Sequence, residues 1–304
     1  MEMNLPPPSH WAPGMSPQVR LATYYQEQEP LDLSTPCWSA AHDASQFAAQ
    51  LNSVAVYFLQ SKSEDEALDI FYQAWKDYQV AVYCQQQSLE QTLVALWNLN
   101  PALPLSILMH PSAFMMESDE HQPTIKSVSV SEVTSSSVVG VPDDLDLAAS
   151  PSNFFSVYNR AFVFREDTAS TFEWLLRRQS ILPAVLLYNI ALIYHRRALQ
   201  QVQADEYHRA LHFYKLSLSV VEDHLNSGLH SSDYCLLKLA LYNNIGYLAS
   251  HFCNENETII YGGRMLATFA SVDCTRLLSK EEYVFFYMNL LFLLNRHPLC
   301  APAA

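Results

Sequence analysis

The triplet Asn189-Ile190-Ala191 lies in the middle of an apolar segment whose large side chains recur every three or four residues. Related triplets return in two later apolar segments as Asn244-Ile245-Gly246 and Asn289-Leu290-Leu291. Apolar residues at this spacing form one stripe along an α-helix. Recurrence at a period of tens of residues predicts helical hairpins that bury their apolar faces on one another. We therefore expect an all-α fold of helical hairpin repeats.

The N-terminal part of the chain predicts a helical pair. Apolar stripes mark helices over 44–59 and 64–83, and Ser63 and Glu66 have the spacing of a capping box at the start of the second. The four-residue connection is typical of antiparallel helices. A third helix is expected over 89–99, which gives a region of three helices over 37–100.

The C-terminal part, 151–300, is expected to form one helical domain. After a helix of about ten residues, Pro183 is expected to open a new helix, because proline is tolerated in a first helical turn. Ser279 and Glu282 form the capping box of the final helix. Because no helix follows it, we interpret this helix as the C-terminal cap of the stack. The expected helices are 183–200, 204–225, 233–252, 258–271 and 280–296.

The remaining segments predict irregular structure and minor strands. Residues 1–36 hold seven of the sixteen prolines and are expected to be irregular. Residues 117–150 are expected to be a flexible, acidic, serine-rich linker, although 127–131 alternates with period two as an exposed strand does. Aromatic and β-branched residues over 154–164 predict a strand, with 105–109 as a possible partner.

The hairpins resemble tetratricopeptide repeats, which place a small residue midway along their first helix and small and aromatic residues along their second. The first unit matches that spacing with Leu51, Val54, Ala55 and Phe58, then Ala67, Phe71 and Ala74. The second and third units match with seven and four extra residues, so the resemblance covers 44–83 and 183–296. It implies a right-handed superhelix whose concave surface binds peptides. The runs Tyr158-Asn159-Arg160-Ala161, Tyr188-Asn189-Ile190-Ala191 and Asn243-Asn244-Ile245-Gly246 also resemble a group of repeat-like proteins from diatoms that has no known activity.

The asparagines Asn189 and Asn244 are candidate partner-binding residues. Ala191 and Gly246 are expected at the crossing points of paired helices, where small residues permit close packing. The asparagines then lie beside these crossings. Two interpretations stay open: each carboxamide clamps a bound peptide, as in many such repeats, or it bridges adjacent helices.

Five arginines concentrate on three neighbouring predicted helices, within a half of the chain that has no net charge. They are Arg177, Arg178, Arg196, Arg197 and Arg209. One interpretation is a solvated face. The other is a basic groove that receives an acidic peptide, possibly the chain's own 143–146 segment.

Charge and composition exclude several classes of function. The net charge is −14, and residues 1–150 carry all of it, with eighteen acidic and four basic side chains. An acidic surface disfavours nucleic acid and anionic membranes as partners. The six cysteines have no metal-knuckle or redox spacing, and we expect them to be reduced. His208 and His212 share a helical face but have no third ligand at a recognisable spacing, so we expect no metal and no cofactor.

The sequence predicts a protein–protein interaction module or scaffold that binds a peptide or partner protein on a concave helical surface. A small-molecule or lipid pocket between helices is an alternative, and an enzyme is a weaker one. The N-terminus lacks a signal peptide and prolines interrupt the longest uncharged stretch, so we expect a cytoplasmic protein, with a nuclear location also open.

Overall fold

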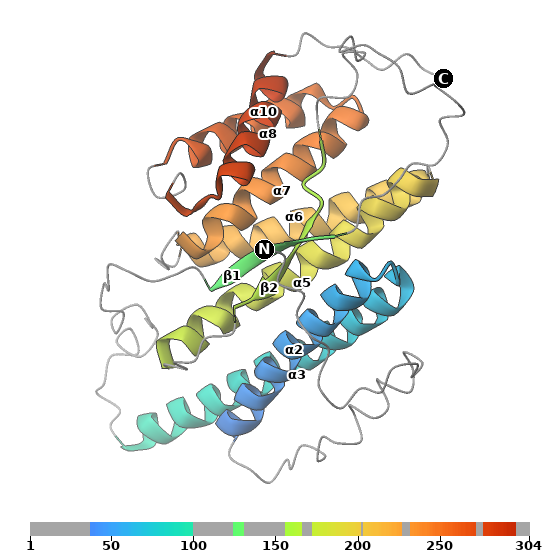
Figure 1. Cartoon of the computed structure of the whole chain (residues 1–304). Helices are drawn as coiled ribbons and strands as arrows, with labels where there is room; N and C mark the ends of the chain where they lie inside the picture. The colour runs from blue at the N-terminus through green and yellow to red at the C-terminus, as the bar shows by residue number, and fades with distance from the viewer. Residues whose placement is uncertain are drawn as a thin grey trace.

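The computed structural model describes residues 37–99, 124–130, 156–165, 172–201, 203–226, 232–271 and 276–295. This part of the chain is mostly helical, as expected, and contains seven helices and two strands (Figure 1). In chain order they are α2 (Cys37–Gln60), α3 (Glu64–Leu99), β1 (Ile125–Ser129), β2 (Arg160–Phe164), α5 (Phe172–Gln201), α6 (Ala204–Asn226), α7 (Ser232–His251), α8 (Glu255–Phe269) and α10 (Lys280–Asn295).

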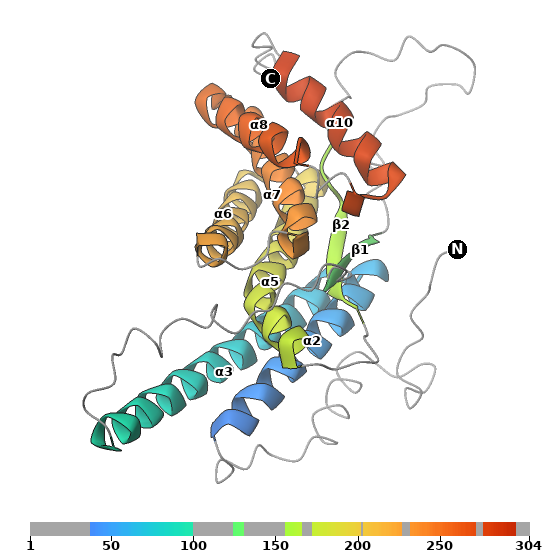
Figure 2. The same ribbon diagram turned by 90° about the vertical axis from the view of Figure 1, so that its left-hand side faces the viewer.

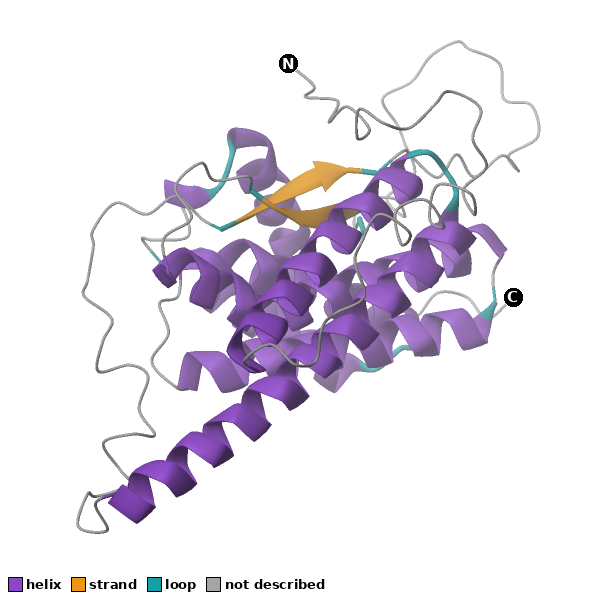
Figure 3. Cartoon of the chain, turned by 90° about the horizontal axis from the view of Figure 1, so that it is seen from below, coloured by secondary structure: helices purple, strands orange, loops and turns teal. Residues whose placement is uncertain are grey.

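The helices pack as hairpins that follow one another in chain order. α2 pairs with α3, α5 with α6, and α7 with α8, and each hairpin contacts the next until α10 packs on α8 and α7. The first helices of successive hairpins, α2, α5, α7 and α10, also contact one another in sequence. Figure 2 shows both strands on the side of α5 and α7 that faces away from α6 and α8, and Figure 3 shows the sheet covering one side of the helices.

The α2–α3 and α7–α8 hairpins close with the same turn. Each helix is followed by a residue with positive φ, Lys62 at 64° in the first turn and Cys253 at 55° in the other. The amide N–H of the next residue then donates to a carbonyl of the preceding helix, at 3.0 Å and 2.8 Å respectively. This bond is typical of the Schellman motif. The two hairpins therefore align at their turns without an insertion, whereas the sequence comparison placed four extra residues in the later one.

Two helices are longer than predicted. α3 continues to Leu99, so the separate helix expected over 89–99 is wrong, and the stretch 84–88 contains no glycine or proline that could end it. α5 runs through Pro183, which was expected to begin a helix. Proline lacks the N–H that would bond the carbonyl one turn earlier. Residues 181–194 are all buried, so packing outweighs the lost hydrogen bond.

The strands form a two-stranded antiparallel sheet in which Ser127 lies opposite Phe162. The expectation of a flexible linker is wrong for 125–129, because Ile125 and Val130 bury their side chains and β2 supplies a partner edge. The strand predicted within 154–164 is confirmed over Arg160–Phe164. Its suggested partner, 105–109, and the segments 1–36 and 143–146 lie outside the described residues.

One hydrophobic core runs through the hairpins and includes β2. Cys235 within it is buried and disulfide-bonded, contrary to the expectation that the cysteines are reduced. Cys253 is free and exposed. Each helix in the described portion of the chain is too short or too polar to cross a lipid bilayer.

Candidate functional site

Residues 156–164 run in extended conformation along the first helices of the hairpins. Successive residues of an extended chain direct their backbone groups to opposite edges. The backbone N–H groups of Ser156, Tyr158 and Phe162 donate to asparagine side chains of the helices. The N–H of Arg165, an odd-numbered residue, donates instead to the Thr124 carbonyl beside β1. The segment therefore has one edge on β1 and the other on the helices.

The asparagines of the three triplets bind the helical edge of this segment. Each one accepts a hydrogen bond from the backbone N–H of a residue and donates one to the carbonyl of the same residue. The pairs are Asn189 with Phe162, Asn244 with Tyr158 and Asn289 with Ser156. The six distances lie between 2.8 and 3.3 Å. We call these three side chains the asparagine ladder.

Two further asparagines, which the sequence analysis did not single out, complete the ladder. Asn52 of α2 donates to the Phe162 carbonyl (3.0 Å) and accepts from Asn189 (2.9 Å). Asn243 of α7 donates to the Ser156 carbonyl at 3.0 Å. Asn52 precedes Ala55 by the same interval as Asn243 precedes Gly246, and this spacing was the signal available in the sequence.

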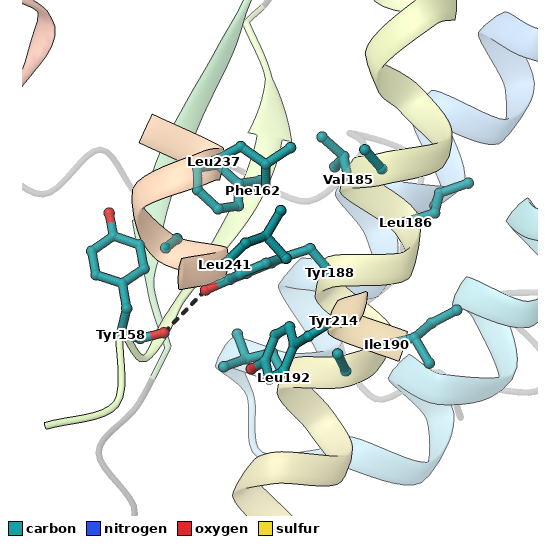
Figure 4. Close-up of a cluster of buried hydrophobic side chains, with 14 of the residues drawn as sticks. Tyr158, Phe162, Val185, Leu186, Tyr188, Ile190, Leu192, Tyr214, Leu237 and Leu241 are labelled. Atoms are coloured by element: carbon teal, nitrogen blue, oxygen red, sulfur yellow. Dashed lines mark hydrogen bonds between the residues drawn. The ribbon is translucent and has the colours of Figure 1, made fainter. Parts of the chain in front are cut away.

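A buried tyrosine cluster supports the middle of the ladder (Figure 4). The Tyr188 hydroxyl donates to the Tyr158 carbonyl (3.1 Å), and the Asn244 amide donates to the hydroxyls of Tyr188 (3.2 Å) and Tyr214 (3.0 Å). Burial raises the pKa of both hydroxyls, so they stay protonated. The Asn244 side chain thus joins α5, α6, α7 and the extended segment.

Of the two interpretations of Asn189 and Asn244, the bridge between helices describes part of this arrangement, and the clamping of a partner's peptide stays a prediction. Asn189 bridges α5 to α2 through Asn52, and both predicted residues clamp an extended peptide. The peptide belongs to the same chain, and it is the segment 156–162. While it is in place, the ladder has no room for a second peptide at these positions.

Two of the predicted arginines join α5 to the start of α3. Arg196 is buried, with its Nε 3.0 Å from a Glu64 carboxylate oxygen and its Nη1 2.9 Å from the Asn159 side-chain oxygen. Arg197 donates to Asp65. Both acids lie in the first turn of α3, where they also complement the helix dipole. These arginines therefore hold the N-terminal hairpin on α5.

The other arginines lie apart from that contact. The Arg178 guanidinium lies over the Phe164 ring at 5.2 Å, and burial lowers its pKa. The Arg209 guanidinium lies 5.7 Å from the Tyr194 ring and 3.7 Å from Glu206. The side chain of Arg177 is outside the described part of the structure. The four predicted arginines whose side chains are described are therefore distributed between different contacts.

Glu282 anchors the other end of the extended segment. Its carboxylate accepts hydrogen bonds from the hydroxyls of Ser127 (2.7 Å) and Tyr158 (3.0 Å) and from the Ser279 amide (3.0 Å). The Glu282 N–H in turn donates to Ser279 Oγ (3.2 Å). These two reciprocal bonds between Ser279 and Glu282 confirm the predicted capping box. Burial alone would raise the pKa of Glu282, but these hydrogen bonds outweigh it and lower the pKa. A partly open hollow of about 270 Å³ lies beside it, lined by 157–160 and Phe285.

His195 should make the fold sensitive to acid. Its ring is buried, with Nδ1 3.5 Å from the Tyr214 hydroxyl, and burial, with a smaller contribution from His251, lowers its pKa to about 3. In the unfolded chain histidine binds a proton near its ordinary value of 6.5. As pH falls from 6.5 towards 3, the unfolded state gains this proton and the folded state does not, so the free energy of unfolding falls by up to about 1.4 kcal/mol per pH unit.

Urea denaturation between pH 7 and 5 measures this contribution. Wild type should lose on the order of 2 kcal/mol more than His195→Phe over that range. His212→Gln, at an exposed position, should follow wild type. Parallel pH profiles for wild type and His195→Phe would show that His195 does not carry the effect.

Among the described residues, no three His, Cys, Asp or Glu side chains gather as a metal site requires. His208 stacks on Phe252, with ring centroids 4.6 Å apart. Comparison with protein-family models, curated proteins and solved structures found no match. Function therefore has to be inferred from the arrangement of the side chains.

Proposed function

We propose that this chain is a protein-interaction scaffold of the tetratricopeptide-like kind, a right-handed superhelix of hairpins that holds a partner protein. Three features support this proposal. The hairpins follow one another in order, the α2–α3 and α7–α8 turns are equivalent, and the asparagine ladder repeats once in each of α5, α7 and α10.

In this proposal the partner does not bind the asparagine ladder, because residues 156–162 of the chain already occupy it. The side chains of Tyr158 and Phe162 belong to the core. Their backbone groups already bond the ladder. A competing peptide would have to replace these hydrogen bonds and expose core side chains. The partner surface is therefore expected elsewhere.

The observation that carries the proposal is an apolar surface on α8 and α10, at the end of the stack away from α2 and α3 (Figures 1 and 2). Its side chains are between 38% and 61% exposed. Scattered apolar side chains are normal on a protein surface, but a contiguous set marks an interaction site. We call it the open face, and it consists of Tyr283, Val284, Tyr287, Met288 and Leu291 of α10 with Ile259 and Leu266 of α8.

Gentle affinity purification from the native cell tests this function, with the amount of bound protein measured per chain. We expect wild type to retain a stoichiometric partner, either another protein or an untagged second copy. A variant with Val284→Lys and Met288→Lys should lose it. A matched variant with Val80→Lys and Val82→Lys, on exposed positions of α3, should keep it. Absence of any stoichiometric partner, or equal recovery with all three chains, would contradict the proposal.

A further inference from the structure

The partly open hollow of about 270 Å³ at the start of α10 has the composition of a small-molecule site. Val130, Val157 and Phe285 give it apolar walls, and Arg160 and Glu281 add charged groups. Sites for small molecules combine mainly apolar walls with a few placed polar groups, and their volumes begin near about 300 Å³. The hollow is therefore of a size for a small ligand.

Hydrogen bonds and a ring contact fix the walls of this hollow. The Gln60 side chain of α2 donates to the Ser129 carbonyl (2.9 Å), and the Tyr158 hydroxyl donates to Glu282 (3.0 Å). The Tyr158 ring also lies 5.4 Å from that of Phe285. These contacts come from α2, the extended segment and α10. A ligand would therefore meet a preformed surface and would not have to order it, which favours binding.

Arg160 brings a half-buried positive charge to the hollow, and it forms no ion pair with the residues that the structure describes. Its Nε donates to the Ser127 hydroxyl oxygen (2.9 Å) and its Nη2 to the Ser127 carbonyl (3.3 Å). The Ser127 hydroxyl donates in turn to Glu282 (2.7 Å), so a neutral group stands between the guanidinium and that carboxylate. A guanidinium has five N–H donors, and these bonds leave Nη1 without a hydrogen bond to the described residues.

We propose that this hollow binds a small monocarboxylate with an apolar body. The carboxylate of the ligand pairs with Arg160, and its apolar body lies against Val157 and Phe285. The planar guanidinium suits such a ligand because its Nη1 and Nη2 present two parallel N–H donors to the two carboxylate oxygens. The site goes beyond the proposed function, because it takes a small molecule and leaves the open face to a protein.

Charge favours a monocarboxylate over a phosphate or a dicarboxylate. Glu281 is exposed and lines the hollow, and Glu282 stays ionised because its hydrogen bonds lower its pKa. One guanidinium therefore lies beside two acidic side chains, in a chain whose net charge is −14. A second negative charge on the ligand would meet this repulsion without a second cation among the residues that line the hollow.

Isothermal titration calorimetry of the full chain at low ionic strength tests this site, with hexanoate and 3-phenylpropionate as probes. At least one probe should bind with a dissociation constant of about 1 mM or lower, which is within reach of so small a ligand. The matching amides have the same shape but no charge, and they should bind at least about 10-fold more weakly. Inorganic phosphate should also bind at least about 10-fold more weakly than the better probe.

Two substitutions at the hollow should shift the affinity in opposite directions. Arg160→Met should weaken binding of the probe by at least about 10-fold, because it removes the charged donor. Glu281→Gln should strengthen binding by about 2-fold or more, because it removes a like charge. The matched controls are Arg264→Met and Glu255→Gln, at residues of α8 that do not line the hollow, and both should bind as wild type does. Circular dichroism establishes that each variant is folded.

A folded wild type that binds neither probe overturns the proposal. An unchanged affinity in folded Arg160→Met does the same, as do amides that bind as tightly as the acids. Phosphate that binds as tightly as the probes overturns the monocarboxylate class, because the hollow then takes anions in general. If Arg160→Met does not fold, the amides and Glu281→Gln decide, and equal binding of acid and amide, or no gain in Glu281→Gln, overturns the pairing with Arg160.

Discussion

Replacing Asn244 by leucine should destabilise the protein by about 3–5 kcal/mol, because several buried polar groups lose their partner together. Leucine has a similar volume but cannot accept from the Tyr158 amide or donate to the hydroxyls of Tyr188 and Tyr214. Each buried group left without a hydrogen bond costs about 1–3 kcal/mol. The effect should therefore exceed that of most single substitutions.

Urea denaturation followed by circular dichroism measures this loss. Asn256→Leu on α8 is the matched control, since that side chain is exposed, and it should change stability by less than about 0.5 kcal/mol. Native-state hydrogen exchange should also show faster exchange of the Tyr158 amide in Asn244→Leu. A variant that keeps both wild-type stability and wild-type protection of that amide would contradict the asparagine ladder.

Replacing Arg196 by methionine should cost about 2–4 kcal/mol, because it leaves the Glu64 carboxylate and the Asn159 side chain without a buried donor. The Arg196 and Glu64 side chains are only 3% and 13% exposed, so solvent replaces little of the lost interaction. A double-mutant cycle with Glu64→Gln should give a coupling of about 1–3 kcal/mol.

Arg197→Met is the control for this prediction. Its hydrogen-bond partner Asp65 is 91% exposed, and the Arg197 Nε lies 3.8 Å from Glu64, beyond hydrogen-bond distance, so its loss should cost about 1 kcal/mol or less. If the two substitutions have equal effects, the assignment of Arg196 as the buried link between α3 and α5 is wrong. An Arg196 variant could lose partner binding simply because the N-terminal hairpin detaches from α5. Such a loss would indicate a basic binding surface only if the hairpin is shown to stay folded in place.

The local signals in the sequence were sufficient for the helices and for much of the core. The three-residue and four-residue spacing predicted the hairpins, and Ser279 with Glu282 predicted a helix start that is confirmed. The predicted helix boundaries were wrong where a local sequence signal competes with packing. Pro183 is a helix-starting signal by itself, but its buried neighbours extend α5 on both sides of it.

The segment that the asparagine ladder binds was not predictable in the same way. Asn52 and Phe162 meet across 110 positions of the chain, and no local pattern encodes such a contact. The period-two pattern of 127–131 pointed to a strand, but the many small hydroxyl side chains favoured a flexible segment. The segment forms a strand because it pairs with β2, which lies more than thirty residues later in the sequence.

The extended segment also changes how the hairpins depend on one another during unfolding. In an ordinary repeat array each unit contacts only its neighbours, so end units can unravel while the centre remains folded. Here Ser156 is attached to α10, Tyr158 to α7, and Phe162 to both α5 and α2. The segment 156–162 thus ties the first hairpin to the last helix. Unfolding at one end therefore breaks contacts that hold the other end, and we expect these hairpins to unfold with the cooperativity of a single globular domain.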